Sequence, residues 1–326
     1  MKIGFIGLGR MGHAMVLRLI ERGVDVVAYN RTQQRTDELS SEIKNLKFKI
    51  KNEGKLYNAY DIASLIAQLA PPRIIWLMVP HGHPVDEMIY ALMSAGISKN
   101  DIVIDGGNSF YKDTVRRYKE LQERGIHYID AGTSGGLEGA RNGACIMVGG
   151  DEKVVKKLSP LLNAAAMKDG WAYFGPSGAG HFVKMVHNGV EYGMLQAIGE
   201  GFEMLAKSPY NLDLHKVAFN WAHGSVVRGW LMELAVRALS NDPRLEKIEG
   251  VVGGGETGEW TVATARELLT ATPVMDASLQ ARKDSQKKPT FAGKIVAALR
   301  NQFGGHPIER SSRSDRDVAS TGQVRL

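Results

Sequence analysis

The stretch HFVKMVHNGVEYG (181–193) places five polar side chains on a segment with helical periodicity and no proline. At 100° per residue, these side chains fall within an arc of about 140°. They are Lys184, His187, Asn188, Glu191 and Tyr192. A lysine and a glutamate on one buried helix can exchange protonation states, as a catalytic base and acid must. The pattern predicts a helix whose polar stripe lines a reactive cleft.

The other side of this predicted helix is apolar and contains Gly189 and Gly193, which would let another helix approach closely. The apolar residues, which we expect to pack, include Val186, Val190 and Met194. The alternative is a solvated network on a surface helix. That alternative is disfavoured because the lysine and the glutamate are seven residues apart, which is not optimal i,i+4 spacing, and amide, imidazole and phenol groups lie between them.

A glycine-rich turn follows a short apolar strand predicted at 2–8 and precedes a helix predicted at 11–23. It has the pattern G-x-G-x-x-G, formed by Gly7, Leu8, Gly9, Arg10, Met11 and Gly12. Such a turn lets a pyrophosphate approach the backbone, and the N–H groups of the helix N-terminus bind it. Alone, the pattern also fits an ordinary glycine turn. The flanking elements, and a second strand at 24–30, favour a dinucleotide site.

The residues that end the second strand favour one of the two nicotinamide dinucleotides. An acidic residue there would bond the ribose hydroxyls of NAD and repel a 2′-phosphate. The chain instead has Asn30, Arg31 and Thr32, with Arg35 close behind. A guanidinium and a hydroxyl suit a phosphate dianion, although Arg31 could also be a solvated loop arginine. We therefore expect NADP as the cofactor, with NAD possible.

Two different patterns of elements position these residues. Short apolar strands alternate with helices in the first half, which indicates a parallel sheet covered by helices. The later strands are expected at 73–80, 101–107, 126–132, 144–150 and 171–175, and the helices at 84–95, 111–124 and 151–164. Helical segments then dominate, at 179–207, 213–238, 259–270, 274–283 and 289–302.

These elements predict an α/β Rossmann-type N-terminal domain and an all-α C-terminal domain. A Gly/Pro/Ser cluster at 175–180 places the boundary between a dinucleotide-binding domain at 1–177 and an all-helical substrate and dimerisation domain at 178–308. The last segment, 309–326, is rich in Ser, Arg and Asp, which favours a mobile tail.

Composition excludes several classes of protein. The 326 residues, 44% hydrophobic and 23% charged, are typical of a globular protein with room for two domains. No apolar run is long enough to cross a bilayer, and the N-terminus does not resemble a signal peptide, so a cytoplasmic protein is expected. Cys145 is the single cysteine, which excludes an internal disulfide and a cysteine-cluster metal site. Its apolar neighbours predict a core residue.

The formal charge of +6 suits an anionic small substrate and a phosphate-bearing cofactor. No aromatic residues are interleaved with the C-terminal arginines, so nucleic acid is not an expected partner. Two further glycine loops, 105–109 and 133–136, follow predicted strands, where open α/β sheets place their binding sites.

Four segments together resemble one family. They are IDGGNS, SGGLEGAR, GPSGAGHFVKMVHNGVEYG and RNQFGGH. They are similar to the decarboxylating 6-phosphogluconate dehydrogenases in their shorter form, within the β-hydroxyacid dehydrogenases. The resemblance runs from residue 1 to about residue 308 and is most specific in the helix at 181–193. It implies oxidative decarboxylation of 6-phospho-D-gluconate to D-ribulose 5-phosphate and CO2 in the pentose phosphate pathway.

The resemblance also implies residue roles. Lys184 would be the general base and Glu191 the acid that protonates C1, with no metal required. The hydroxyls and carboxylate would be held by Asn108, Ser134, Gly135, Gly136, His187 and Asn188. Tyr192 and Arg282 would hold the phosphate. The cofactor would also contact Val79, Pro80, His81 and Asn108.

Arg300 and His306 match an arginine and a histidine that the family takes from the neighbouring subunit, which implies at least a dimer, with a tetramer possible. The chain departs from the longer members at Gly255, where a phosphate-contacting lysine is expected, and at His81, where a lysine commonly follows the valine. It also lacks much of the second half of their helical domain. Two alternatives stay open: a non-decarboxylating dehydrogenase of 3-hydroxyisobutyrate or tartronate semialdehyde type, and a cofactor-binding protein without catalysis.

Overall fold

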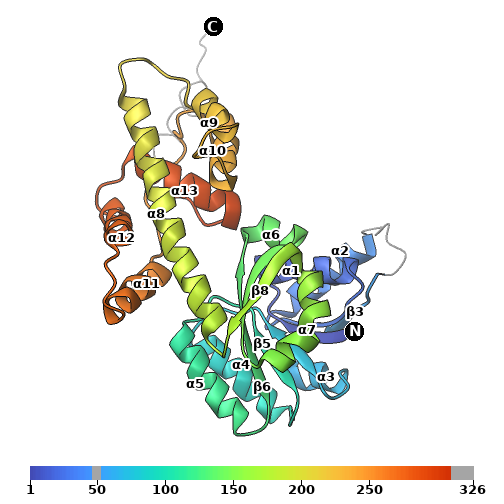
Figure 1. The fold of residues 1–326 in the computed structure, drawn as a ribbon. Helices are drawn as coiled ribbons and strands as arrows, with labels where there is room; N and C mark the ends of the chain where they lie inside the picture. Colours follow the sequence, from blue (N-terminus) through green and yellow to red (C-terminus); the bar gives the residue numbers. More distant parts are fainter. Residues whose placement is uncertain (46–52, 310–326) are drawn as a thin grey trace. The chain divides into compact units, whose positions relative to one another are not determined.

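The computed structural model describes residues 1–45 and 53–309 (Figure 1). The chain divides into two compact units, Met1–Val186 and His187–Leu326. We call them the sheet unit and the helical unit. The boundary predicted from sequence, after residue 177, lies at the start of a long helix, and the compact units divide within that helix.

The sheet unit contains an eight-stranded sheet with the order β3-β2-β1-β4-β5-β6-β7-β8. All neighbouring strands are parallel except β6 and β7, which are antiparallel. The strands are β1 (Lys2–Ile6), β2 (Asp25–Tyr29), β3 (Leu56–Ala59), β4 (Ile74–Leu77), β5 (Ile102–Asp105), β6 (His127–Ser134), β7 (Ala144–Gly149) and β8 (Ala166–Gly175). The predicted α/β class is confirmed.

The helices of the sheet unit cover both faces of this sheet. They are α1 (Arg10–Glu21), α2 (Gln33–Asn45), α3 (Ile62–Ala67), α4 (His83–Ser94), α5 (Tyr111–Gln122), α6 (Gly136–Asn142) and α7 (Glu152–Ala165). Adjacent strand residues belong to separate apolar clusters: Phe5 and Trp76 lie in one, Ile6 and Leu77 in the other. Because side chains alternate along a strand, the sheet has a core on each face.

Four elements of the sheet unit were not predicted: α2, β3, α3 and α6. Helix α2 is strongly polar and buries only Thr36 and Leu39, so its apolar stripe is too narrow to read from sequence. Strand β3 is only four residues long. Tertiary pairing with β2, rather than a local pattern, selects the strand.

The helical unit is built around α8 (Ala179–Lys207), which begins in the sheet unit and continues without a break. The other helices are α9 (Leu214–Ala222), α10 (Trp230–Asn241), α11 (Glu256–Glu267), α12 (Pro273–Ser285) and α13 (Phe291–Gly304). The core joins α8, α10 and α13 through Phe202, Leu234 and Ile295. The predicted all-helical character of this part is confirmed.

One helix was predicted wrongly. The sequence suggested a single helix over 213–238, but the structure has two, α9 and α10, which pack against each other. The break contains Gly224 with φ 83° and Gly229 with φ 153°. These positive φ values are incompatible with a continuous right-handed helix, so the chain turns and α10 packs back on α9.

Cys145 was also predicted wrongly, because it is exposed rather than in the core. Its neighbours Ala144 and Ile146 point inward and are buried. The pairing of β7 with β8 shifts register between these two residues, so Cys145 has no partner in β8, although it pairs with Ser134 of β6.

Of the predicted tail, residues 310–326 lie outside the described part of the chain. Among the described helices, none combines the length and apolar character that crossing a bilayer would require.

Candidate active site

The three glycines of the dinucleotide turn have three different structural roles. Gly7 has φ 101°, and a Cβ atom there would overlap the Met78 carbonyl. A Cβ atom at Gly12 would overlap the carbonyl of Gly7, so glycine is needed for α1 to pack against this turn. A Cβ atom at Gly9 would meet nothing within 4 Å. Gly9 therefore borders open space, where a pyrophosphate can approach the backbone.

Helix α1 begins directly after Gly9, and no side chain caps it. The positive end of the helix dipole therefore remains available for an anion. The Asn30 side chain accepts a hydrogen bond from the Leu8 N–H at 2.9 Å and donates to the Thr32 carbonyl at 3.1 Å. Asn30 thus ties the end of β2 to the glycine turn. Arg31 and Thr32 are exposed beside it.

The loop after β4 lies between the glycine turn and the loop after β5. A Cβ atom at Gly7 would be 3.2 Å from Val79 Cγ1, and one at Gly107 would be 3.0 Å from the Val79 carbonyl oxygen. Pro80 is exposed and His81 half-buried. The three loops predicted to contact the cofactor therefore lie side by side at the carboxyl ends of their strands.

A buried carboxylate shapes the loop that carries Asn108. Asp105 accepts hydrogen bonds from the Gly107 N–H at 3.1 Å, the Ser109 hydroxyl at 2.7 Å and the Tyr128 hydroxyl at 2.8 Å. Burial, together with the charge of Asp105, raises the pKa of Tyr128 well above its ordinary value. This clamp holds the half-buried Asn108 at the edge of the sheet.

A buried arginine supports this clamp. Arg117 is 1% exposed and donates to Asp86 at 2.7 Å and to the Gly82 carbonyl at 2.9 Å. Its Nη1 lies 3.9 Å from Asp105. Burial disfavours the charged guanidinium, but the hydrogen bond to Asp86, together with the charges of Tyr128, Asp86 and Asp105, outweighs this and raises the pKa of Arg117. Sequence reasoning missed both Tyr128 and Arg117; for Tyr128 the available signal was its place as a polar residue within the apolar segment IHYIDAG.

Lys184 is buried against β6. It is 7% exposed, and a Cβ atom at Gly132 would be 2.5 Å from the Lys184 Cβ. The strand therefore needs glycine where the lysine stem crosses it. Asp130, on the same strand, accepts hydrogen bonds from the N–H groups of Gly178 at 2.8 Å and His181 at 2.9 Å. These two bonds anchor the first turn of α8 and so set the position of Lys184.

Strand β6 ends at Ser134, and its end forms the predicted glycine rim. Gly135 and Gly136 have φ values of 114° and 58°, which favour glycine and turn the chain into α6. Within the sheet unit, Lys184 therefore lies against β6, the strand that ends at Ser134 and is followed by Gly135 and Gly136.

In the helical unit, α8 carries the rest of the predicted stripe. His187 Nδ1 and Asn188 Oδ1 are 3.2 Å apart, and Asn188 is buried. Glu191 and Tyr192 are half-buried. The predicted polar stripe therefore exists, but its side chains are largely withdrawn from solvent, as a reactive site requires.

Gly189 and Gly193 of α8 behave as predicted. A Cβ atom at Gly189 would be 2.6 Å from Thr261 Cγ2, and one at Gly193 would be 3.0 Å from Val274 Cγ1. They allow α11 and α12 to approach closely, which is confirmed. The expectation that the apolar side packs is wrong for Val186, Val190 and Met194, which are exposed in the single chain. The glycines, not these larger residues, face the neighbouring helices.

Arg282 stacks on Tyr192, with its Cζ 3.7 Å from the ring centroid. The Tyr192 hydroxyl lies 3.1 Å from the hydroxyl of Thr257. Burial lowers the pKa of Arg282, and burial together with the charge of Arg282 lowers the pKa of Arg300 to about 10. His306 instead packs at the end of α13, where its ring makes an edge contact with Phe303.

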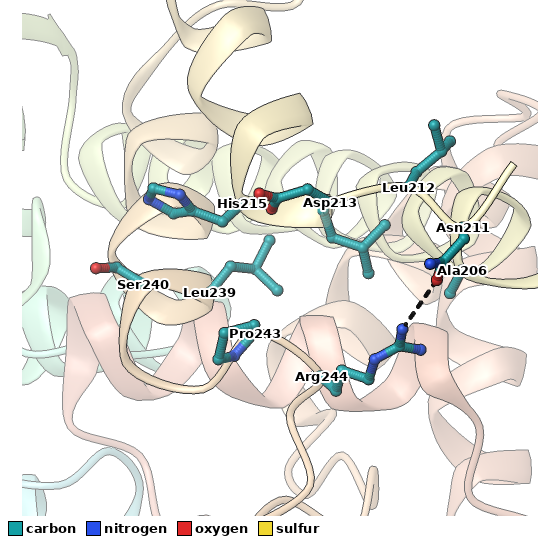
Figure 2. Close-up of a pocket in the computed structure, with 10 residues that line it drawn as sticks. Ala206, Asn211, Leu212, Asp213, His215, Leu239, Ser240, Pro243 and Arg244 are labelled. Carbon is teal, nitrogen blue, oxygen red and sulfur yellow. Dashed lines mark hydrogen bonds between the residues drawn. The ribbon is translucent and has the colours of Figure 1, made fainter.

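A separate cavity of about 400 Å³ lies in the helical unit (Figure 2). Its lining includes Ala206, Asn211, Leu212, Asp213, Leu214, His215, Leu239, Ser240, Pro243 and Arg244. Arg244 donates to Asn211 across it at 3.3 Å, and Asp213 caps α9. The cavity coincides with none of the residues predicted to bind substrate. Within the described residues, no cluster of three His, Cys, Asp or Glu side chains could hold a metal ion.

The glycine turn at a switch between strands, the uncapped α1 and the buried lysine define a nicotinamide-dinucleotide dehydrogenase of the Rossmann class. Comparison with known families agrees. The NAD-binding domain of 6-phosphogluconate dehydrogenase matches residues 2–175, and the 6-phosphogluconate dehydrogenase C-terminal domain matches residues 180–301. The chain belongs to the 6-phosphogluconate dehydrogenase family.

One relative that this chain matches over the relative's full length is YqeC of Bacillus subtilis, which is provisionally named a 6-phosphogluconate dehydrogenase. It is 48% identical over 313 residues, covering 95% of this chain and 100% of the relative. The NAD-dependent decarboxylating 6-phosphogluconate dehydrogenase of Haloferax volcanii is 40% identical, and the match covers 95% of this chain and 99% of that relative. The solved 6-phosphogluconate dehydrogenase of Plasmodium falciparum is 33% identical with a TM-score of 0.79, covering 88% of this chain and 62% of that longer one.

Proposed function

We propose that the protein oxidatively decarboxylates 6-phospho-D-gluconate to D-ribulose 5-phosphate and CO2. The observation that carries this proposal is the single helix α8, which bears a buried lysine near its start and a half-buried glutamate two turns later. A base and an acid on one rigid element suit a reaction that removes one proton and later delivers another.

Lys184, as the neutral amine, takes the proton of the C3 hydroxyl. The nicotinamide cofactor, when bound, supplies the acceptor for the C3 hydride. The resulting keto group is β to the carboxylate, so the electrons of the breaking C–C bond pass toward that carbonyl as CO2 leaves. Lys184, now an ammonium, returns a proton to the carbonyl oxygen to give an enediol. Glu191 then protonates the carbon that is C2 of the sugar acid and becomes C1 of the ketose, while Lys184 takes back the proton of the enol hydroxyl on the former C3, which yields the ketose.

For the cofactor, we propose NADP in preference to NAD. The support is the exposed Arg31 and Thr32 at the end of β2, with no carboxylate at positions 30–32 to repel a 2′-phosphate. A relative named as NADP-dependent, from Bacillus subtilis, is 39% identical, whereas the Haloferax relative is named as NAD-dependent. Because the relatives include both kinds of enzyme, their names do not indicate which cofactor this chain prefers. The proposal is therefore based on the residues of this chain.

We further propose that the protein acts as a homo-oligomer, at least a dimer. Helix α8 exposes Val190 at 47% and Met194 at 51%, and α12 exposes Val274 at 66%. Gly193 of α8 contacts Val274, so these apolar residues form one neighbouring patch. A second copy of the chain would remove it from water.

One assay tests the activity. Purified protein is mixed with 6-phosphogluconate and NADP or NAD, and reduced cofactor and CO2 are measured together. Reduced cofactor and CO2 are expected in equal amounts. The KM for NADP is expected to be lower than the KM for NAD. Cofactor reduction without CO2 would instead indicate a non-decarboxylating hydroxyacid dehydrogenase. The absence of reduction with any hydroxyacid would indicate a binding protein without catalysis.

A further inference from the structure

A buried histidine in the first turn of α8 has no part in the proposed reaction. His181 is 1% exposed, and Thr114, in the first turn of α5, is fully buried. The His181 Nδ1 and the Thr114 hydroxyl are 2.7 Å apart. Thr114 donates its hydroxyl hydrogen to the Phe110 carbonyl at 3.3 Å, so its oxygen accepts from Nδ1. This hydrogen bond joins the start of α8 to the start of α5.

Packing alone does not account for a polar ring at this position. The His181 Nε2 has no hydrogen-bond partner in the described chain, so the bond to Thr114 is the one hydrogen bond that the ring makes there. A buried ring nitrogen without a partner costs free energy, and an apolar side chain would avoid that cost. The ring is better explained by what its single bond holds in place.

Other contacts already limit how the first turn of α8 can slide or tilt. Phe182 makes an edge contact with the Tyr111 ring of α5, with ring centroids 5.2 Å apart. A Cβ atom at Gly180 would be 2.4 Å from the carbonyl oxygen of Met147 on β7, so the backbone lies close to the sheet. The His181 side chain adds a directional hydrogen bond, which limits rotation of the turn about the helix axis.

Rotation matters because of the residues that follow or precede these two turns. Lys184 comes three residues after His181, and residues three apart are neighbours on one face of a helix. The Lys184 stem crosses β6 where a Cβ atom at Gly132 would be only 2.5 Å from the Lys184 Cβ. On the other helix, Asn108 lies just before the N-cap of α5. The hydrogen bond thus relates the proposed base to a loop proposed to hold substrate.

We propose that His181 is a positioning residue for Lys184 and acts through its hydrogen bond to Thr114. Its role is to fix the rotation of the first turn of α8 relative to α5, so that the Lys184 amine stays in one place. The effect on turnover rests on the proposed function, whereas the placement of the amine does not. The two are therefore measured separately.

Kinetics measures the effect on turnover. Thr114→Val removes the hydroxyl and keeps a branched side chain of similar size. Its kcat with 6-phosphogluconate should fall by about tenfold, since a misplacement of about 1 Å can cost about 100-fold. The KM for NADP should stay at the wild-type value, because the glycine turn is untouched. Thr114→Ser keeps the hydroxyl and should restore the wild-type kcat.

Thr36→Val is the matched control. Thr36 is also fully buried on a helix of the sheet unit, but its hydroxyl has no hydrogen-bond partner in the described chain. The same chemical change therefore removes no hydrogen bond and should leave kcat unchanged. Equal kcat values for Thr114→Val and Thr36→Val would overturn the proposal.

Chemical labelling tests the placement of the amine without the reaction. Native protein is treated with limiting acetic anhydride, and the labelling rate of each lysine is measured by mass spectrometry. Thr114→Val should speed the labelling of Lys184 by about 2- to 10-fold, the change in local opening expected from losing one hydrogen bond. Half-buried Lys294, which donates to the Leu245 carbonyl in the helical unit, should be labelled at the wild-type rate.

These outcomes separate the inference from the proposed function. If Thr114→Val speeds the labelling of Lys184 but wild-type protein does not oxidise 6-phosphogluconate, the proposed function fails and the positioning role stands. If wild-type protein is active and Lys184 is labelled equally fast in both proteins, the positioning role fails and the function stands. Faster labelling of Lys184 and Lys294 by the same factor would show global loosening, which also contradicts the positioning role.

Discussion

The sheet unit and the helical unit present their candidate site residues by different means. In the sheet unit, the positions proposed to bind through the backbone lie close to strand ends, and Gly7, Gly12 and Gly135 permit the required turns. In the helical unit, long side chains provide the charge. Arg282 reaches Tyr192, and Arg300 reaches Gly253, across separations of 90 and 47 residues. The first kind of site is local in sequence, whereas the second depends on how helices pack.

This contrast suggests that substitutions will have different consequences in the two units. A backbone site should fail when a Cβ atom is added, because the turn has no space for it. A site made of side chains should lose binding when a substitution removes a charged or planar group, even though the fold is kept. Lys184 stands between these cases, because its stem is fixed by the sheet unit while its amine is the group proposed to perform the proton transfer.

The largest effect is expected for Lys184→Ala. Turnover should fall by at least about 100-fold, because a positioned base contributes roughly that much to the rate. The measurement is kcat with 6-phosphogluconate and NADP. Lys156→Ala, which removes an exposed lysine paired with Glu152, serves as the control and should keep the wild-type rate. A near-normal kcat for Lys184→Ala would remove the role assigned to this residue.

The glycine turn offers a matched pair of substitutions. Gly12→Ala should lower the free energy of unfolding by about 1–3 kcal/mol, because its methyl group would overlap the carbonyl of Gly7. Gly9→Ala should leave stability unchanged, since nothing lies within 4 Å of the added atom, but should weaken dinucleotide binding. Denaturant unfolding and cofactor titration measure the two effects. The same response from both variants would contradict the distinct roles given to these glycines.

Asp86→Asn tests the polar clamp beneath Asn108. Removing the carboxylate that pairs with buried Arg117 should cost about 1–2 kcal/mol at pH 7, less than for a fully buried pair because Asp86 is partly exposed. The pKa of Asp86 is lowered in the folded protein: burial opposes this shift, but hydrogen bonds from Arg117 and Arg116 outweigh it. A lowered carboxyl pKa stabilises the folded state above the pKa of an unfolded aspartate, near 3.9, and this contribution is lost as the pH falls through the folded value.

The difference between wild type and Asp86→Asn should therefore be constant near neutral pH and shrink below about pH 4. Urea unfolding at several pH values measures it. Glu152→Gln, in an exposed pair with Lys156, should change stability by less than about 1 kcal/mol. A pH-independent difference for Asp86→Asn would mean that the carboxylate charge is not what stabilises the clamp.

The smallest effect is expected for Arg31→Ala. Affinity for NADP should fall by about tenfold, as for loss of one exposed charged contact, while affinity for NAD should change little. Fluorescence titration with both cofactors measures the ratio, with Arg124→Ala as an exposed-arginine control. Equal weakening of NADP and NAD would rule out a contact between Arg31 and the 2′-phosphate.

The sequence predicted best where a function depends on local backbone geometry. The G-x-G-x-x-G turn, the parallel arrangement of β1, β2, β4 and β5, and the full extent of α8 were all readable from spacing. The buried partners were not. Tyr128 and Arg117 converge on Asp105 from other elements, and no local pattern encodes that convergence. The break between α9 and α10 was missed because helix-forming residues surround the two glycines that lie within the break.

By itself, the amino-acid sequence determined which chemical groups the protein carries and the order of its elements, because glycine turns and apolar periodicity act over a few residues. It also placed a lysine and a glutamate, the proposed base and acid, two turns apart on one helix. Only the tertiary structure decided which residues on the apolar side of that helix pack, because Val186, Val190 and Met194 stay exposed in the single chain. Two glycines, rather than the larger apolar residues, allow α11 and α12 to approach, because close helix contact requires small side chains. The tertiary structure likewise decided that Arg282 stacks on Tyr192 and that Arg300 bonds the Gly253 carbonyl, since contacts between distant segments depend on packing that no local pattern specifies.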